Sequence, residues 1–112
     1  MEKAIQSYAS LFGNGKVSPV TFISSQKVNV CFIEMGNAMY LELVEPVDES
    51  STVYSLKKMG WTYYHVGYEV KDFPSALEVL RQKRYKLINT FQSEAFGNRR
   101  CAFLISPAKH MI

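Results

Sequence analysis

The stretch VNVCFIEMGNAMYLELVEP, residues 28–46, decides which fold this chain is expected to adopt. Residues 28–34 form an apolar run that suits a strand buried on both faces, and residues 38–44 alternate as a half-buried strand does. The Met-Gly-Asn-Ala sequence at 35–38 predicts a tight hairpin turn between them, because Gly and Asn tolerate the positive φ angles of such turns. The stretch therefore predicts an antiparallel strand pair.

The rest of the first half is expected to contribute a helix, a short strand and a second short helix. Gly13, Asn14 and Gly15 end the first helix, whose apolar residues recur at helical spacing. Ser50 or Ser51 is the expected cap of the second helix. In chain order, these elements are expected at residues 2–12, 19–23 and 53–59.

The second half repeats this order of elements. Residues 61–70 alternate as a strand, with Trp61, Tyr63, His65 and Gly67 on one face. Asp72 then predicts the cap of a helix that ends near residue 83, with an apolar stripe formed by Phe73, Ala76, Leu77 and Leu80. Further strands are expected at residues 85–90 and 99–106, and a last one begins at 110–112.

The order of elements predicts a single α+β domain made of two βαβββ modules that form a cupped mixed sheet. Module one covers about residues 1–47, a connector covers 48–60, and module two covers about 61–112. In these residues the first module lacks its opening strand and the second lacks its closing strand.

The composition excludes several classes of protein. The 112 residues are 47% hydrophobic and 21% charged, which is not the composition of a disordered chain, and a net charge of +3 does not favour nucleic acid as a partner. No apolar run approaches the roughly 18 residues of a membrane span, and no secretion signal is recognisable. Cys31 and Cys101 lie in apolar runs, so reduced thiols are favoured over a disulfide. We therefore expect a cytoplasmic protein.

Three segments carry a resemblance to methylmalonyl-CoA epimerases. They are the strand pair ending in ELVEP at 42–46, the stretch from DESSTVYSL at 48–56 to YHVGYEVKD at 64–72, and FGNRRCAFLISP at 96–107. Together they cover nearly the whole chain in order. The chain thus resembles the vicinal oxygen chelate superfamily, which includes glyoxalases, bleomycin-resistance proteins and extradiol dioxygenases. Its fold of two βαβββ modules agrees with the order of elements above.

The resemblance implies a divalent metal held by four side chains, one each from the first and last strands of both modules. Glu42 and His65 match two of these ligands, and the other two positions fall outside the sequence. His110 cannot replace a missing ligand, because alternation along its strand would turn its side chain to the opposite face of the sheet. Glu69 lies about 13 Å along the strand from His65, which is too far to share an ion with it. The implied cofactor is a cobalt, zinc, manganese or nickel ion if the site is completed, and none otherwise.

Further candidate residues have a structural interpretation beside the functional one. From spacing alone, Glu42 could face solvent and His65 could be a hydrogen-bonded core histidine. Arg99 and Arg100 follow a Gly-Asn turn and could bind phosphate, or they could form a solvated strand entrance. The resemblance implies that a ligand cavity is lined by Tyr40, Trp61, Tyr63 and Gly67.

The function implied by the resemblance is to act on or bind a small carbonyl or acyl-thioester compound. The epimerases move a proton beside a thioester carbonyl, with a metal that polarises the carbonyl and a carboxylate that carries the proton. The alternative is a non-catalytic small-molecule binder similar to the bleomycin-resistance proteins, and whether the chain is an enzyme stays open. The expected partners are a small molecule and a second copy in a homodimer or strand-swapped oligomer, because unpaired strand edges invite pairing. Neither nucleic acid nor a membrane is expected.

One residue, Arg84, must reverse the chain between the helix that ends near Lys83 and the strand that starts at Tyr85. The epimerases that the chain resembles usually have glycine there. We therefore expect Arg84 in the left-handed conformation that follows many helices.

Overall fold

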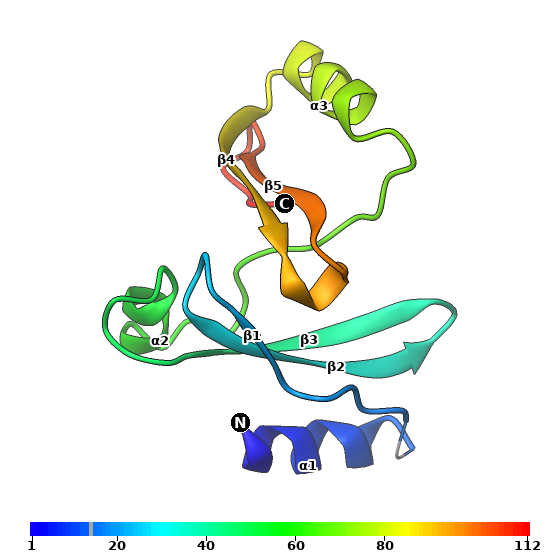
Figure 1. Ribbon diagram of the computed structural model, residues 1–112, viewed down its shortest axis with the longest axis vertical. Helices are drawn as coiled ribbons and strands as arrows, with labels where there is room; N and C mark the ends of the chain where they lie inside the picture. The colour runs from blue at the N-terminus through cyan, green and yellow to red at the C-terminus, as the bar shows by residue number, and fades with distance from the viewer. Residues whose placement is uncertain (14) are drawn as a thin grey trace.

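In the computed structural model, which describes residues 1–13 and 15–112, two antiparallel sheets lie next to each other (Figure 1). The first has the strand order β1-β2-β3, and helix α1 packs against β2. The second pairs β4 with β5 and has helix α3 beside it. The first module contributes α1 (Glu2–Leu11), β1 (Thr21–Ile23), β2 (Val28–Gly36) and β3 (Met39–Pro46), and the connector contributes helix α2 (Tyr54–Lys58). The second module contributes α3 (Phe73–Gln82), β4 (Lys86–Ser93), the 3-10 turn η1 (Glu94–Phe96) and β5 (Arg99–Ile105).

The predicted hairpin is confirmed. Strand β2 pairs with β3 in a register that sets Phe32 opposite Glu42 and Gly36 opposite Met39. Asn37 and Ala38 form the turn with φ angles of 54° and 58°, as a two-residue turn of type I′ requires. Asparagine tolerates this conformation, whereas in alanine it costs on the order of 1 kcal/mol.

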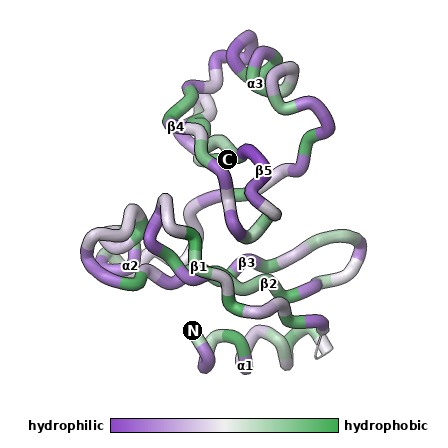
Figure 2. Tube along the Cα trace, viewed as in Figure 1, coloured by the Kyte–Doolittle hydropathy of each residue, from purple (hydrophilic) through white to green (hydrophobic). Residues whose placement is uncertain are grey.

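Strand β2 forms the centre of the core, because it is paired on both sides and covered on both faces. Val28, Val30, Cys31 and Ile33 are at most 1% exposed. The hydropathy-coloured trace shows this apolar stretch along β1 and β2 (Figure 2). The thiol of Cys31 is free and buried, and that of Cys101 is free and half-buried, as the sequence predicts.

The predicted cap and apolar stripe of α3 are also confirmed. The backbone N–H of Ser75 donates to the Asp72 carboxylate at 3.0 Å, which caps the helix. The half-buried side chains of the helix are Phe73, Ala76, Leu77 and Leu80.

Helix α2 begins one residue later than expected, with Val53 at its N-cap and no side-chain cap. Of the two expected caps, Ser50 donates its hydroxyl to Asp48 instead. The Ser51 hydroxyl donates to the Gln26 carbonyl and accepts from the Val53 N–H at 3.4 Å, in the turn that leads into the helix.

Arg84 adopts the predicted left-handed conformation, with a φ of 64°. Its N–H donates to the Arg81 carbonyl at 3.0 Å, and the Tyr85 N–H donates to the Leu80 carbonyl at 2.9 Å. These two bonds are those of a Schellman motif, in which the last carbonyls of a helix gain partners.

The expected strand at 61–70 is wrong. Trp61 donates its N–H to Leu56, but no backbone hydrogen bond joins residues 62–70 to another segment of the described chain. A sheet strand needs a neighbouring strand whose backbone N–H and C=O groups form hydrogen bonds with its own. The last segment supplies no such neighbour, because it bonds to β5 instead through the bridge between Ile105 and Met111. The apolar alternation of 61–70 therefore yields an extended segment and no sheet strand.

The expected single cupped mixed sheet is also corrected, since the structure has two separate sheets in which every pairing is antiparallel.

The modules meet through a limited set of contacts. The N–H and hydroxyl of Ser24 donate to Glu94, which holds the pKa of that carboxyl below its usual value. The rings of Phe32 and Phe96 lie 5.5 Å apart. The radius of gyration is 14.8 Å, against about 13 Å for a compact domain of this length, so the two modules are loosely joined.

The structure also bears on the membrane question. None of the described helices is long and apolar enough to cross a lipid bilayer.

The predicted end of α1 at Gly13 has a positive φ of 68°, and the part of that prediction that falls on Asn14 lies outside the described residues.

The left-handed position of Arg84 generates a stability prediction. Arg84→Gly should leave the free energy of unfolding unchanged or raise it by up to about 1 kcal/mol, because relief of the Cβ contact offsets the greater unfolded-state entropy of glycine. Urea denaturation measures the difference. The control is Ser75→Gly in the first turn of the same helix, where the backbone is right-handed and glycine should lower the free energy of unfolding by up to about 1 kcal/mol. A loss of more than about 1 kcal/mol for Arg84→Gly would contradict the prediction.

Candidate functional site

The two predicted metal ligands, Glu42 and His65, lie next to each other although they come from different modules. The Nε2 atom of His65 is 3.5 Å from the Oε2 atom of Glu42. Glu42 is supplied by β3, and His65 by the extended segment 61–70. Both side chains are largely buried, with 16% of the His65 side chain and 24% of the Glu42 side chain exposed. The fold thus brings together a carboxylate and an imidazole in a partly shielded place.

Aromatic rings hold the imidazole of His65 in position. The ring of Tyr64 is centred 4.4 Å from it, and the ring of Phe103 meets it edge-on at 5.4 Å. Phe91 stacks on Phe103 from β4. These contacts replace the sheet pairing that was expected to position His65.

The hydrogen bonding of His65 is incomplete. Its Nδ1 atom is buried and has no partner in the described part of the chain. Its Nε2 atom lies 3.5 Å from the Glu42 carboxylate, whereas a good N–H···O hydrogen bond measures about 2.9 Å between the heavy atoms. Buried polar groups are nearly always satisfied, so an imidazole in this state calls for an additional partner.

The spacing of the two donor atoms suits a shared cation. Two ligands at about 2.1 Å from a tetrahedral ion lie roughly 3.4 Å from each other, close to the distance seen here. The described residues offer no group of three or more His, Cys, Asp or Glu side chains that could hold a metal. Glu42 and His65 therefore fit two corners of a metal site, and the remaining ligands have no counterpart among the described residues.

The charge of Glu42 also affects its neighbours. Burial raises the pKa of the Tyr64 hydroxyl, and the negative charge of Glu42 raises it further. Burial likewise raises the pKa of the Cys101 thiol, with Arg99 opposing the shift and Glu42 adding to it. At neutral pH both groups stay protonated, and Tyr64 can donate a hydrogen bond.

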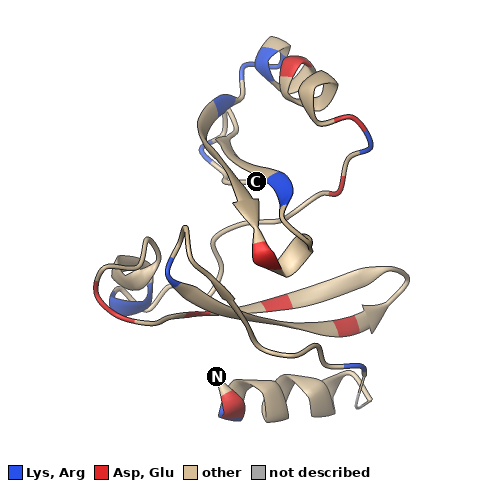
Figure 3. Ribbon diagram, in the orientation of Figure 1, with Lys and Arg blue, Asp and Glu red and all other residues tan. Residues whose placement is uncertain are grey.

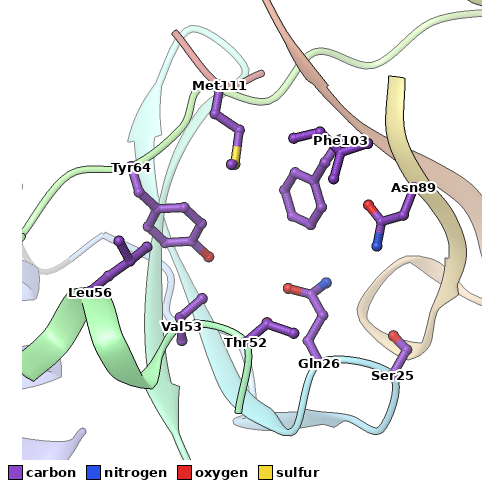
Figure 4. A pocket seen from close by; sticks show the side chains of 10 residues that line it. Ser25, Gln26, Thr52, Val53, Leu56, Tyr64, Asn89, Phe103 and Met111 are labelled. Atoms are coloured by element: carbon purple, nitrogen blue, oxygen red, sulfur yellow. The ribbon is translucent and has the colours of Figure 1, made fainter. Parts of the chain in front are cut away.

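A pocket of about 200 Å³ lies beside this pair, between the β1–β2 turn, the connector and the second sheet (Figure 4). The pocket shares Tyr64 and Phe103 with the surroundings of His65. The side chains of Gln26 and Asn89 direct their amide groups toward its centre, and the Tyr64 hydroxyl points into it (Figure 4). The lining residues are Ser25, Gln26, Thr52, Val53, Leu56, Tyr64, Ile88, Asn89, Phe103 and Met111.

The four residues expected to line a ligand cavity lie elsewhere. Tyr40 and Trp61 are each 60% exposed, Tyr63 is 80% exposed, and Gly67 is exposed as well. None of them lines the pocket described above. Strand alternation would set Tyr64 and His65 on opposite faces, but the rings of these two residues pack together because the segment is not part of a sheet. The assignment of the four residues to a ligand cavity stays a prediction.

The two arginines proposed for phosphate both have protein partners. Arg99 donates to the Glu69 carboxylate at 3.1 Å and to the Phe96 carbonyl. The guanidinium of Arg100 lies 4.5 Å above the ring of Phe73. These contacts occur at exposed positions, and a role in phosphate binding stays a prediction for both residues.

Sequence reasoning missed Gln26, Asn89 and Phe103. Gln26 follows two serines in a turn, and nothing in the sequence shows that it is only 8% exposed. Phe103 belongs to the apolar run CAFLI at 101–105, in which any residue could face the core. These positions become functional candidates only when the modules are assembled.

Comparison with known proteins shows the family to which this chain belongs. Residues 1–103 match the Glyoxalase/Bleomycin resistance protein/Dioxygenase superfamily, and the chain belongs to this superfamily. It is also 33% identical over 86 residues to "Uncharacterized protein YqjC" of Bacillus subtilis (strain 168). That alignment covers 76% of this chain and 60% of the relative, so the match spans about three fifths of the relative's length.

The protonated state of Cys101 generates a prediction for alkylation. At neutral pH, iodoacetamide should modify Cys101 more slowly than free cysteine, because only the thiolate reacts and burial raises the pKa. Glu42→Gln should speed the reaction, since it removes a negative charge that disfavours the thiolate. Mass spectrometry follows the modification, with Cys31, which is 0% exposed, as the unreactive internal control. Modification of native Cys101 at the rate of free cysteine would contradict the prediction.

Proposed function

We propose that this chain binds a small carbonyl or acyl-thioester compound at a divalent-metal site built on Glu42 and His65. The approach of the two side chains across the module boundary to 3.5 Å is the observation that carries the proposal. The length of this contact supports it, because 3.5 Å leaves the Nε2 atom and the carboxylate oxygen free to share a cation. Membership of the superfamily supports the substrate class.

Each residue has a defined role in this proposal. When bound, a divalent cation would polarise the carbonyl of the ligand and ease loss of a neighbouring proton. Glu42 and His65 would hold the cation, and the rings of Tyr64 and Phe103 would keep water away from the imidazole. The protonated Tyr64 hydroxyl could donate to a ligand oxygen. An epimerase of the methylmalonyl-CoA type also needs a base, and we assign none to the described residues.

The second candidate function is a non-catalytic small-molecule binder, as in bleomycin-resistance proteins. The neighbouring pocket with its free amide groups favours it, because such groups suit binding and do not supply a base. Assays of methylmalonyl-CoA epimerisation and of glyoxalase activity with added cobalt, zinc, manganese or nickel separate the two. Turnover that is lost in His65→Ala supports the enzyme, whereas binding without turnover supports the binder.

We also propose that a second copy of the chain covers the extended segment 62–70. The backbone of this segment is unpaired within the described chain, and several large side chains on it are exposed, namely Tyr63, Val66, Tyr68 and Val70. Unpaired extended backbone is a template for strand addition, and exposed aromatic residues are enriched at interfaces.

Metal affinity tests the proposed site. Zinc, cobalt or manganese should bind with a dissociation constant no tighter than about micromolar, because two protein ligands leave most of the coordination to water. Isothermal titration calorimetry measures it, and Glu42→Gln or His65→Ala should abolish the residual binding. His110→Ala is the matched control and should have no effect. Binding that survives both site variants would show that the metal sits elsewhere.

Sedimentation tests the proposed association. The chain should form a dimer at tens of micromolar, and Tyr68→Lys should weaken association roughly tenfold or more, because a charge at a strand edge opposes pairing. Ser7→Lys, which adds the same charge at an exposed position on α1, should leave the mass unchanged. A monomer for the unmodified chain at these concentrations would refute the proposal.

A further inference from the structure

We propose that the pocket between the modules binds a small uncharged ligand that joins an aromatic ring to an amide-like group. This inference rests on the second candidate function and deepens it, because it names the ligand class of that pocket. It uses Gln26 and Asn89, which the proposed metal site does not, and it needs no cation. It rests on three features of the pocket: its lack of charge, its unpartnered polar groups, and its aromatic walls.

The pocket is uncharged at neutral pH. Its ten lining residues include no Asp, Glu, Lys, Arg or His. The charged residues are scattered over the two modules, on the helices, on the strands of both sheets and in the turns (Figure 3). A charged ligand would lose its hydration here without gaining a partner, so the pocket selects against ions.

The polar groups of the pocket are available to a ligand. Gln26 is 8% exposed, yet its side-chain amide makes no hydrogen bond within the described chain, and the same holds for the Asn89 amide and the Tyr64 hydroxyl. An amide offers two donors and an acceptor, and the Tyr64 hydroxyl adds a further donor and acceptor. A ligand with a donor and an acceptor next to each other, such as an amide, would satisfy Gln26 and Asn89 together.

The walls of the pocket suit a ring. Tyr64 and Phe103 face the space from two sides, with Met111 between them and Leu56 on the side of Tyr64 (Figure 4). Aromatic side chains favour offset or edge-on contacts with another ring. A volume of about 200 Å³ corresponds to roughly seven water molecules at about 30 Å³ each, enough for one six-membered ring with a single polar substituent.

The test uses benzamide as the probe and benzoate as its charged counterpart. Titration of the full ¹⁵N-labelled chain, with EDTA present, follows the side-chain amide signals of Gln26 and Asn89. Benzamide should shift these signals with a dissociation constant on the order of 1 mM, as expected for a ligand of this size. Benzoate should bind at least about tenfold more weakly, since the pocket holds no cation.

Variants locate the binding, and EDTA separates it from the metal site. Asn89→Leu should weaken benzamide binding about tenfold, because a hydrogen-bond partner is lost, while Gln92→Leu on the same strand should have no effect. EDTA, and not a variant of Glu42 or His65, makes this separation, because both of those residues act on Tyr64. The proposal is overturned if benzamide causes no shift of the Gln26 or Asn89 amide signals or if benzoate binds as tightly as benzamide. It is also overturned if Asn89→Leu and Gln92→Leu have the same effect on benzamide affinity. Because EDTA removes metal throughout, failure of the metal proposal leaves this result intact.

Discussion

The pairing of β2 with a neighbour on each side is the interaction on which the rest of this structure depends. Val28, Val30 and Ile33 lose nearly all their exposure in this arrangement, and full burial of each such side chain contributes about 1.5–3 kcal/mol. Because the core contains few other buried apolar residues, these contributions dominate the first module. The same strand pairing determines where β3 lies and, with it, the position of Glu42 opposite Phe32.

The second half of the candidate site is positioned by a different kind of interaction. His65 belongs to a segment without sheet hydrogen bonds, and ring contacts with Tyr64 and Phe103 hold it beside Glu42. Ring contacts constrain the imidazole less than a strand ladder would. The loose 3.5 Å approach leaves the Nε2 atom and the Glu42 carboxylate open to a further partner. The Nδ1 atom has no partner among the described residues and so lacks the hydrogen bond that usually orients a metal-binding imidazole.

Membership of the superfamily and the geometry of the site bear on function at different levels. The superfamily match covers residues 1–103, and the description of the superfamily includes glyoxalases, dioxygenases and bleomycin-resistance proteins, so membership does not select one activity. The chain carries a carboxylate–imidazole pair and, next to it, an uncharged pocket with free amide groups. The two features share Tyr64 and Phe103, so a ligand in the pocket would lie close to the pair without being held by it.

Local patterns in the sequence determined the features that short-range physics controls. The Gly-Asn turn, the Asp72 cap, the apolar stripe of α3 and the left-handed Arg84 follow from backbone preferences and periodicity within a few residues. Only the tertiary structure decided the state of residues 61–70, because alternation shows that a segment can form a strand but not whether a partner lies beside it. It also decided which polar side chains surround the pocket. Gln26, Asn89 and Tyr64 meet there from three separate segments, and their proximity depends on long-range packing that no local pattern encodes.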